Sequence, residues 1–308
     1  MYERSLKRTL DRLGRLIPEQ VSAEKDLAKN TTFRVGGPAA VFAVADTLHD
    51  LHVIVGTATE YELPMLLLGR GSNLLISDSG YPGVVLKLGR DFQRVSVMGE
   101  QIICGAAVTL GNLIQTTMKQ SLKGLSFAIG IPGTVGAAIA INAGANDFDM
   151  GSIVSQVTTY NSRCQLTSKS HDEIGFSYRS TTLEKDLIIL EARLQLTAGK
   201  QEQIKSEMEI NFRKRKESQP LGQPSAGCIF KNPDGMAAGK LIDMAGCKGW
   251  KIGGAMVSEK HANYIVNNGD ASAQDIYLLL KKVQKEVKST SNILLDPEIK
   301  IIGEFNDV

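Results

Sequence analysis

The chain has 308 residues, of which 43% are hydrophobic and 22% charged, and its 35 Lys and Arg against 33 Asp and Glu give a net charge of +2. A chain of this length is expected to form about two domains with full cores, and its composition excludes a disordered, collagen-like or coiled-coil protein. The balanced charge does not indicate a nucleic-acid or membrane surface, and no run of about 18 apolar residues predicts a membrane span.

The cysteines and histidines do not form a metal motif. Cys104, Cys164, Cys228 and Cys247 stand far apart, so no C-x-x-C pair for structural zinc or thioredoxin-type redox chemistry exists. The four histidines lack partners at ligand spacing, and we expect no metal. The N-terminal residues lack the apolar core of a signal peptide, so we expect a cytoplasmic protein.

The first third of the chain shows a mixed α/β pattern. Apolar residues at helical spacing predict a helix over residues 2–17. Asp46 is a candidate N-cap for a second helix, whose apolar face would hold Leu48, Leu51, Val55 and Ala58. Short apolar runs predict strands over residues 41–45, 64–68 and 84–88.

The rest of the chain predicts a second α/β pattern around a charged connector. A strand pair is predicted at 94–97 and 102–104, a helix from Thr109, and strands at 153–160, 164–167 and 187–196. The connector helix over about 200–217 would turn Ile204, Met208 and Phe212 inward. Beyond it we expect helices near 237–245 and 273–288, and strands near 252–257, 263–267 and 298–302.

Two glycine-rich segments are candidates for binding a phosphate group. The strand over 64–68 leads into Gly69-Arg70-Gly71-Ser72-Asn73, which exposes the backbone N–H groups and hydroxyl that a diphosphate binds. The segment is neither a GxGxxG fingerprint nor a P-loop, so a tight structural turn is the alternative.

The second segment is Ile129-Gly130-Ile131-Pro132-Gly133-Thr134-Val135-Gly136-Ala137. Its proline fixes a turn before a helix, and the start of that helix would offer free N–H groups and a positive dipole to an anion. A close-packed, glycine-rich core is the alternative. Two such loops together favour a dinucleotide.

Cations and a cysteine follow near the end of the connector helix. Arg213, Lys214, Arg215 and Lys216 lie where the helix dipole favours positive charge. The stretch after them ends at Cys228, directly before an apolar strand. An isolated cysteine in such a place is usually inert packing, which is the alternative to a chemical role.

Six segments occur in an order that resembles the UDP-N-acetylenolpyruvoylglucosamine reductase family. They are residues 30–39 (NTTFRVGGPA), 68–75 (LGRGSNLL), 130–136 (GIPGTVG), 178–179 (YR), 224–233 (PSAGCIFKNP) and 295–300 (LDPEIK). The resemblance extends from about residue 20 to about residue 303. The modest length is similar to the shorter class of the family, which lacks an extra tyrosine-bearing loop.

The resemblance implies an α+β fold in which a two-lobed FAD-binding domain of the p-cresol-methylhydroxylase (PCMH) type precedes a smaller α/β substrate-binding domain. The implied parts are a lead-in over residues 1–30, the FAD-binding domain over 31–199 with lobes 31–88 and 89–199, the substrate-binding domain with its connector helix over 200–303, and a tail over 304–308.

The resemblance also implies a reaction. An NADPH-dependent flavoenzyme would reduce UDP-N-acetyl-3-O-(1-carboxyvinyl)-glucosamine to UDP-N-acetylmuramate, a peptidoglycan precursor needed for the cell wall, cell shape and cell division. The flavin N5 hydride would add to the enolpyruvyl C3, and an acid would protonate C2. The implied partner is a small-molecule UDP-sugar, bound by a monomer without nucleic acid or membrane.

The resemblance assigns site residues position by position. Those matched to the FAD site are Gly69, Arg70, Gly71, Ser72, Asn73, Gly130, Ile131, Pro132, Gly133, Thr134, Gly136, Ala137, Asn142 and Gly144. Those matched to the substrate site are Tyr178, Arg213, Arg215, Lys231 and Asn232.

Three positions are matched to catalytic roles. Arg179 matches the arginine that holds the substrate carboxylate, and a guanidinium binds the charge that builds there bidentately. Glu298 matches the glutamate that stabilises the enolic intermediate, for which it must be protonated or positioned by hydrogen bonds. Cys228 matches the acid.

The family usually has serine where this chain has Cys228. A thiol with a pKa of about 8.5 is a stronger acid than an alkyl hydroxyl, so proton donation survives, at the cost of exposure to oxidation. Ser225 is the rival donor.

Two other functions compete with this interpretation. Another PCMH-type FAD oxidoreductase with a different substrate would have the two glycine-rich loops but not the segments 224–233 and 295–300. A flavin- or nucleotide-binding protein without turnover would leave Arg179, Cys228 and Glu298 without a role.

Overall fold

The computed structural model describes residues 2–184 and 186–307, and the chain divides into two compact units. The first unit comprises Met1–Ala23, Val41–Gly69 and Gly83–Lys214, and the second comprises Glu24–Ala40, Arg70–Pro82 and Arg215–Val308. Each unit is therefore assembled from three stretches of chain.

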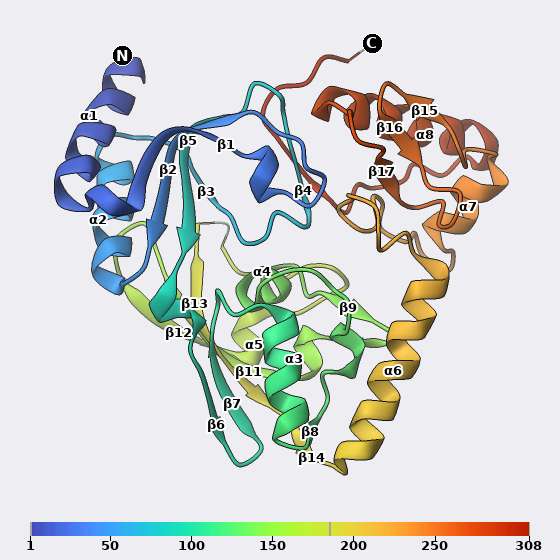
Figure 1. Ribbon diagram of the computed structural model, residues 1–308, viewed down its shortest axis with the longest axis horizontal. Coiled ribbons are helices and arrows are strands. Elements are labelled where there is room, and N and C mark those ends of the chain that lie inside the picture. The colour runs from blue at the N-terminus through green and yellow to red at the C-terminus, as the bar shows by residue number, and fades with distance from the viewer. Residues whose placement is uncertain (1, 185, 308) are drawn as a thin grey trace. The chain divides into compact units, whose positions relative to one another are not determined.

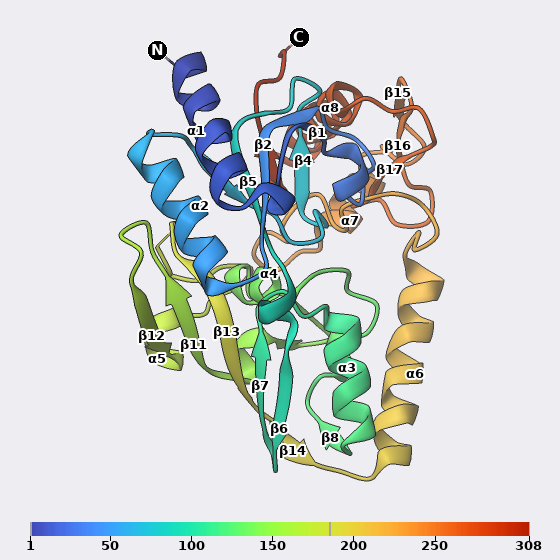
Figure 2. The same cartoon turned by 60° about the vertical axis from the view of Figure 1, so that its left-hand side comes forward.

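A helical pair packs against a small sheet, and most residues of both belong to the first unit. The helices are α1 (Tyr2–Leu16) and α2 (Leu48–Glu60), which lie side by side in Figure 2. The sheet has the order β1-β2-β5-β3, with the strands β1 (Val21–Asp26), β2 (Pro38–Ala45), β5 (Tyr81–Leu88) and β3 (Met65–Leu67). Leu13, Leu51, Ile54 and Leu86 are fully buried in the shared core.

A five-stranded antiparallel sheet forms the rest of the first unit (Figure 1). Its order is β12-β11-β13-β7-β6, with the strands β12 (Leu166–Ser170), β11 (Val154–Tyr160), β13 (Ile188–Gln195), β7 (Gln101–Gly105) and β6 (Val95–Met98). Its core includes side chains of α3 (Leu110–Lys119), α4 (Val135–Ala140), α5 (His171–Ile174) and α6 (Gln201–Ser218). The short pairs β8 (Leu122–Lys123) with β14 (Thr197–Ala198), and β9 (Gly144–Ala145) with β10 (Phe148–Asp149), complete it.

The second unit packs one long helix on a three-stranded sheet. The helix α8 (Ala273–Ser291) buries Ile276, Leu280 and Val283. The sheet has the order β15-β16-β17, with the strands β15 (Lys251–Ile252), β16 (Ala255–Val257) and β17 (Ile265–Asn267). The helix α7 (Ala238–Met244) and the parallel pair β4 (Leu74–Ile76) with β18 (Lys300–Ile302) belong to the same unit.

Most predicted elements are present, and five details are wrong. The N-cap of α2 is Thr47 and not Asp46, because the Thr47 hydroxyl accepts from the Asp50 N–H in a capping box. Leu48 and Phe212 are exposed rather than turned inward. The strand predicted over 164–167 begins only at Leu166, as β12, and Cys164 lies in the turn before it with a φ of +60°. The strand predicted over 252–257 is a hairpin that turns at Gly253.

Seven short elements were not predicted: β1, β4, β8, β9, β10, β14 and α5. Within residues 2–184 and 186–307, no helix has the length and apolar character to cross a bilayer.

Candidate functional site

The two predicted phosphate loops meet inside the first unit. Gly69 stands so close to the second loop that a Cβ at this position would lie 2.9 Å from the Thr134 Oγ1 and 3.5 Å from the Ala137 Cβ. Gly130 adopts a φ of +75°, which glycine accepts without strain. Two segments far apart in sequence therefore pack directly against each other at Gly69, where there is no room for a side chain.

The N–H groups at the start of α4 are already used. The Val135 N–H donates to the Val108 carbonyl at 2.8 Å, and the Gly136 N–H donates to the Ala106 carbonyl at 2.9 Å. The expectation that this helix start offers free N–H groups to an anion is wrong for these two residues. Gly136 serves close packing instead, since a Cβ there would lie 2.8 Å from the Ala106 Cβ.

The remainder of the first loop belongs to the second unit. Gly71 has a φ of +61°, and a Cβ there would lie 2.3 Å from the Asn30 carbonyl oxygen. Its own carbonyl accepts from the Thr32 N–H at 3.2 Å. The side-chain amide of Asn73 donates to the Glu298 carbonyl at 3.3 Å. The loop predicted to hold the cofactor is therefore bonded to a predicted catalytic residue.

Arg179 lies in a strained turn of the first unit. Ser177 and Ser180 exchange two backbone hydrogen bonds, and Arg179 between them has a φ of +53°, a left-handed conformation that is uncommon for non-glycine residues. Its guanidinium donates to the Gly144 carbonyl at 2.8 Å and lies 5.2 Å from the ring centre of Tyr178. The turn presents an oriented cation.

The side chain of Asn142 is hydrogen-bonded to this turn. Its amide donates to Asp149 and to the Ser177 carbonyl, each at 2.9 Å, and accepts from the Gly151 N–H at 2.9 Å. The side chain is 2% exposed. Its polar atoms are used inside the protein, so the role visible for Asn142 is to hold the segment that carries Arg179.

Cys228 stands at the start of a segment held from two sides in the second unit. On one side, the Ile229 N–H donates to the Asn263 carbonyl at 2.9 Å, and the Asn263 amide bonds both backbone groups of Phe230. On the other side, the Glu298 N–H donates to the Ile229 carbonyl at 2.7 Å. These bonds bring the neighbourhoods of Cys228 and Glu298 together, and both residues are half-buried.

Sequence reasoning missed Tyr264, which is hydrogen-bonded to Cys228. Burial raises the pKa of the Tyr264 hydroxyl. Negative charge on Cys228 or Glu298 raises this pKa further, and the positive charge of Arg215 lowers it. Tyr264, Cys228, Arg215 and Glu298 therefore form one electrostatic cluster in the second unit. A tyrosine in a predicted strand gave no signal for this role.

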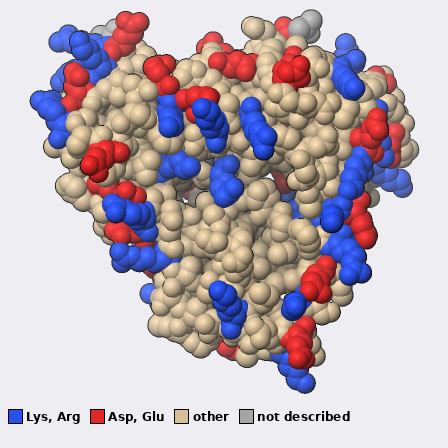
Figure 3. All heavy atoms as spheres, in the orientation of Figure 1, with Lys and Arg blue, Asp and Glu red and all other residues tan. Residues whose placement is uncertain are grey.

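The predicted substrate residues occupy different surroundings. Tyr178 and Arg213 are exposed in the first unit, where basic and acidic side chains alternate along α6 (Figure 3). Lys231 is held by its backbone, whose N–H donates to the Asp296 carbonyl at 2.8 Å. The Asn232 amide oxygen accepts from the Ala238 N–H at the start of α7.

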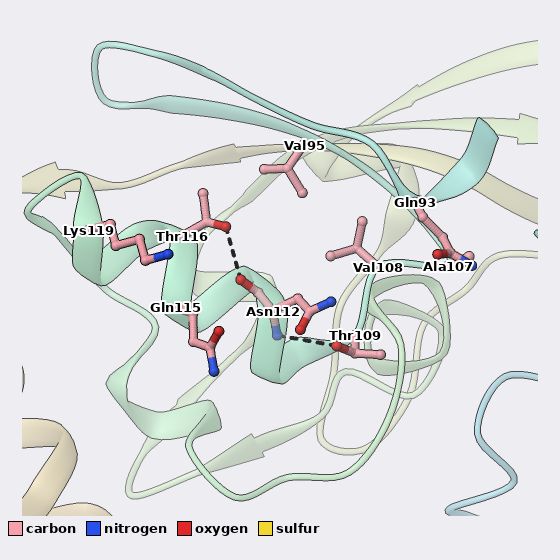
Figure 4. A pocket seen from close by; sticks show the side chains of 9 residues that line it. All are labelled: Gln93, Val95, Ala107, Val108, Thr109, Asn112, Gln115, Thr116 and Lys119. Carbon is pink, nitrogen blue, oxygen red and sulfur yellow. Dashed lines mark hydrogen bonds between the residues drawn. The ribbon is translucent and has the colours of Figure 1, made fainter. Parts of the chain in front are cut away.

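A hollow of about 380 Å³ lies beside α3 (Figure 4). The nine described residues that line it include none of the predicted site. Its hydroxyls serve the helix, because Thr109 accepts from the Asn112 N–H and Thr116 donates to the Asn112 carbonyl. Among the described residues, no group of three His, Cys, Asp or Glu could hold a metal ion.

The glycine-lined loops fit a bound dinucleotide, and a comparison of families agrees. A model of the FAD-binding domain matches residues 38–161, which contain Gly69, Thr134 and Asn142. The grass pollen allergen Phl p 4, which has glucose dehydrogenase activity, shares the fold with a TM-score of 0.51 at 14% identity, over 63% of this chain and 44% of that one. The fold and the loops together define an FAD-binding flavoprotein of α+β class.

Other relatives match nearly the whole chain. A model of the C-terminal domain of UDP-N-acetylenolpyruvoylglucosamine reductase matches residues 219–302. The reductase of Caldanaerobacter subterraneus is 41% identical over 96% of this chain and 98% of its own, and that of Bacillus subtilis is 39% identical over 92% and 94%. The crystal structure of the reductase from Thermus caldophilus has a TM-score of 0.81 at 36% identity, over 92% and 98%. The chain belongs to the UDP-N-acetylenolpyruvoylglucosamine reductase family.

Proposed function

We propose that this protein reduces UDP-N-acetyl-3-O-(1-carboxyvinyl)-glucosamine to UDP-N-acetylmuramate, with FAD as its cofactor and NADPH as the hydride donor. One observation carries the proposal: Glu298 is bonded through its N–H to the Cys228 segment and through its carbonyl to Asn73 of the cofactor loop. Hydrogen bonds of the Glu298 backbone thus join the segment after Cys228 to the loop that contains Asn73.

The cofactor would be held by Gly69, Gly130, Gly133 and Thr134 around its diphosphate, together with the segment from Arg70 to Asn73. Bound FAD supplies the chemistry that the side chains lack, namely hydride transfer from NADPH to the enolpyruvyl C3 of the substrate. The Gly69–Thr134 contact supports this assignment because it brings the two glycine-rich loops that match the cofactor site next to each other.

Arg179 would bind the substrate carboxylate, onto which negative charge spreads once C3 has received hydride. Its bond to Gly144 and its ring contact with Tyr178 orient the guanidinium before substrate arrives. A donor aimed in advance costs no reorganisation at the moment of reaction, which is how such groups stabilise a transition state.

Cys228 would give its proton to C2, and Glu298 would stabilise the enolic intermediate beside it. The half-buried thiol has the acidity for the task. Ser225, on the same segment, is the rival donor. Arg215, Lys231 and Asn232 belong to the same unit and would bind the UDP-sugar together with Tyr178 and Arg213.

The absorbance of the purified protein tests this function. We expect a yellow protein that NADPH bleaches without oxygen and that regains its colour only when the enolpyruvyl UDP-sugar is added. Bleaching without recovery of colour points to an FAD oxidoreductase with another substrate. A colourless protein that does not take up FAD contradicts the proposal.

We further propose that the enzyme is a cytoplasmic monomer that acts on a small UDP-sugar without a nucleic-acid or membrane partner. The near-neutral net charge of +2 supports the absence of a nucleic-acid surface. Gel filtration tests the monomer, and cell fractionation tests the location.

A further inference from the structure

The hydroxyl of Tyr264 faces the one thiol that the proposed reaction uses. Tyr264 is 5% exposed, and its side chain is hydrogen-bonded to Cys228. A buried tyrosine hydroxyl usually has a hydrogen-bond partner. Here the partner is a proposed proton donor.

Hydrogen bonds hold the segments that carry the two side chains next to each other. Asn263, the residue before Tyr264, bonds the backbone of Ile229 and Phe230, the two residues after Cys228. The carbonyl of Tyr264 accepts from the Ser258 N–H at 2.8 Å, and its N–H donates to the His261 carbonyl at 3.0 Å. Neither segment can shift without breaking bonds in a buried region, so the contact is built into the unit.

We propose that Tyr264 is a positioning residue for Cys228: its hydroxyl donates a hydrogen bond to the sulfur, aims the S–H bond and stabilises the thiolate that remains after proton transfer. This inference rests on the proposed function. In the step itself, the S–H bond breaks and its electron pair stays on sulfur, while the proton forms a C–H bond at C2 with the electron pair of the enolate. Water then returns a proton to the sulfur, and Tyr264 keeps its own throughout.

The charges around the pair fit this assignment. Burial raises the pKa of Tyr264, so the hydroxyl stays protonated and can only donate to a thiolate. Arg215 and Glu298 are the charged groups that act on the hydroxyl. The ring of His261 lies 4.8 Å away edge-on, and burial lowers its pKa, so it is neutral above pH 7 and leaves titration there to the thiol.

The experiment measures the rate at which iodoacetamide alkylates Cys228 in the holoenzyme as a function of pH, with the labelled peptide identified by mass spectrometry. In Tyr264→Phe we expect the midpoint to rise by about one pH unit, because the thiolate loses a charge-assisted hydrogen bond. Tyr277→Phe is the matched control, since it removes a hydroxyl bonded to Asp307 in the same unit. Its midpoint should equal that of the wild type.

The half-reactions give a second readout. Tyr264→Phe should slow reoxidation of the reduced flavin by the UDP-sugar about tenfold and leave reduction by NADPH unchanged, since one pKa unit corresponds to a tenfold change. An unchanged alkylation midpoint together with unchanged reoxidation overturns the role of Tyr264. Loss of both half-reactions together assigns Tyr264 to the fold and equally overturns it.

A second variant covers the case in which Tyr264→Phe does not fold. Site-specific 3-fluorotyrosine in place of Tyr264 keeps the shape and makes the hydroxyl a stronger donor. The alkylation midpoint should then fall, and a rise or no change contradicts the proposal. Cys228→Ala separates the role of Cys228 as the acid from the role of Tyr264. If Cys228→Ala turns over within about tenfold of wild type, the proposed acid is wrong. If its turnover is lower and Tyr264→Phe behaves as wild type, only the role of Tyr264 is wrong.

Discussion

The acid that we propose at position 228 should act in only one of the two half-reactions. In Cys228→Ala we expect overall turnover to fall by about 10²–10⁴, the usual contribution of a general acid. Flavin reduction by NADPH needs no proton from this residue and should keep its rate. Stopped-flow absorbance of the flavin follows both steps, and Cys228→Ser should recover much of the loss.

Cys164→Ala provides a control for that experiment, because Cys164 is a partly exposed thiol in a turn of the other unit. It should leave both half-reactions at wild-type rates. If Cys228→Ala slows both half-reactions equally, the residue is structural, which was the alternative drawn from its sequence context. If neither slows, Ser225 is the next acid to test.

Arg179 combines a chemical role with a strained backbone, and two substitutions separate these effects. Arg179→Ala and Arg179→Gly should both weaken substrate reduction by about 2–4 kcal/mol, as expected for a lost charge-stabilising donor. Arg179→Gly should also unfold at higher temperature than Arg179→Ala, because glycine accepts the φ of +53°. Steady-state kinetics and thermal unfolding measure the two effects.

Arg193→Ala is the matched control for Arg179, since Arg193 is an exposed arginine on β13 of the same unit. Equal activity of Arg179→Gly and wild type would remove Arg179 from the proposed site.

The sequence indicated Arg179, Cys228 and Glu298 only through their resemblance to a family. The local sequence pattern alone favoured a buried, chemically inert Cys228 before a strand. Tyr264 could not be predicted, because its contact with Cys228 depends on hydrogen bonds between Asn263 and Phe230, which are 33 positions apart. Pairing at such a distance leaves no periodicity in the chain.

At the scale of elements, the close approach of two loops makes Gly69 a test of the cofactor site. A Cβ in Gly69→Ala would lie 2.9 Å from the Thr134 Oγ1, closer than real contacts allow, so either the Thr134 side chain or one of the loops must move. We expect FAD affinity to fall at least about tenfold, which corresponds to a cost near 1.4 kcal/mol. Titration of the apoprotein with FAD, followed by flavin fluorescence, measures it.

Gly111→Ala is the control for this change, because nothing lies within 4 Å of a Cβ at this helical position. It should retain full FAD affinity and gain roughly 0.5–1 kcal/mol of stability from its higher helix propensity. Unchanged FAD binding in Gly69→Ala would mean that the loops meet for packing alone.

The helix α4 shows which features of an element the sequence pattern can predict and which it cannot. Small residues after Pro132 correctly predicted a helix, which begins at Val135 after Thr134. They could not show that the Val108 and Ala106 carbonyls would take the first N–H groups. The partner of a helix end depends on which segment folds beside it, and α6 illustrates the same limit: Ile204 and Met208 are buried as expected, but Phe212 is not.

For the whole molecule, two buried thiols predict how stability depends on pH. Burial raises the pKa of Cys247 from 9.0 to about 11 and that of Cys104 to about 12. The folded state therefore holds these protons more tightly than the unfolded chain does. The free energy of unfolding should be constant with respect to these thiols below pH 9 and should fall as the pH rises from 9 toward 11.

Urea unfolding at a series of pH values measures this decline. Cys247→Ala should be less stable than wild type at neutral pH, because it leaves a small cavity, but should lose less stability between pH 9 and 11. If the stability of this variant falls as steeply between pH 9 and 11 as that of wild type, titratable groups other than Cys247 cause the loss of stability at high pH.

The second unit has a consequence for how the protein is made. The Asn267 amide bonds the Phe33 carbonyl 234 positions earlier, and the Ala273 N–H bonds Asp78 195 positions earlier. At a synthesis rate of roughly 5–20 residues per second, residues 24–40 wait roughly 10–50 s after leaving the ribosome for their partners to appear. During that interval Phe33 and Leu75, which end fully buried, are exposed on the nascent chain. The protein should therefore depend on chaperones during translation, and a ribosome stalled before residue 215 would release a chain whose second unit has not begun to fold.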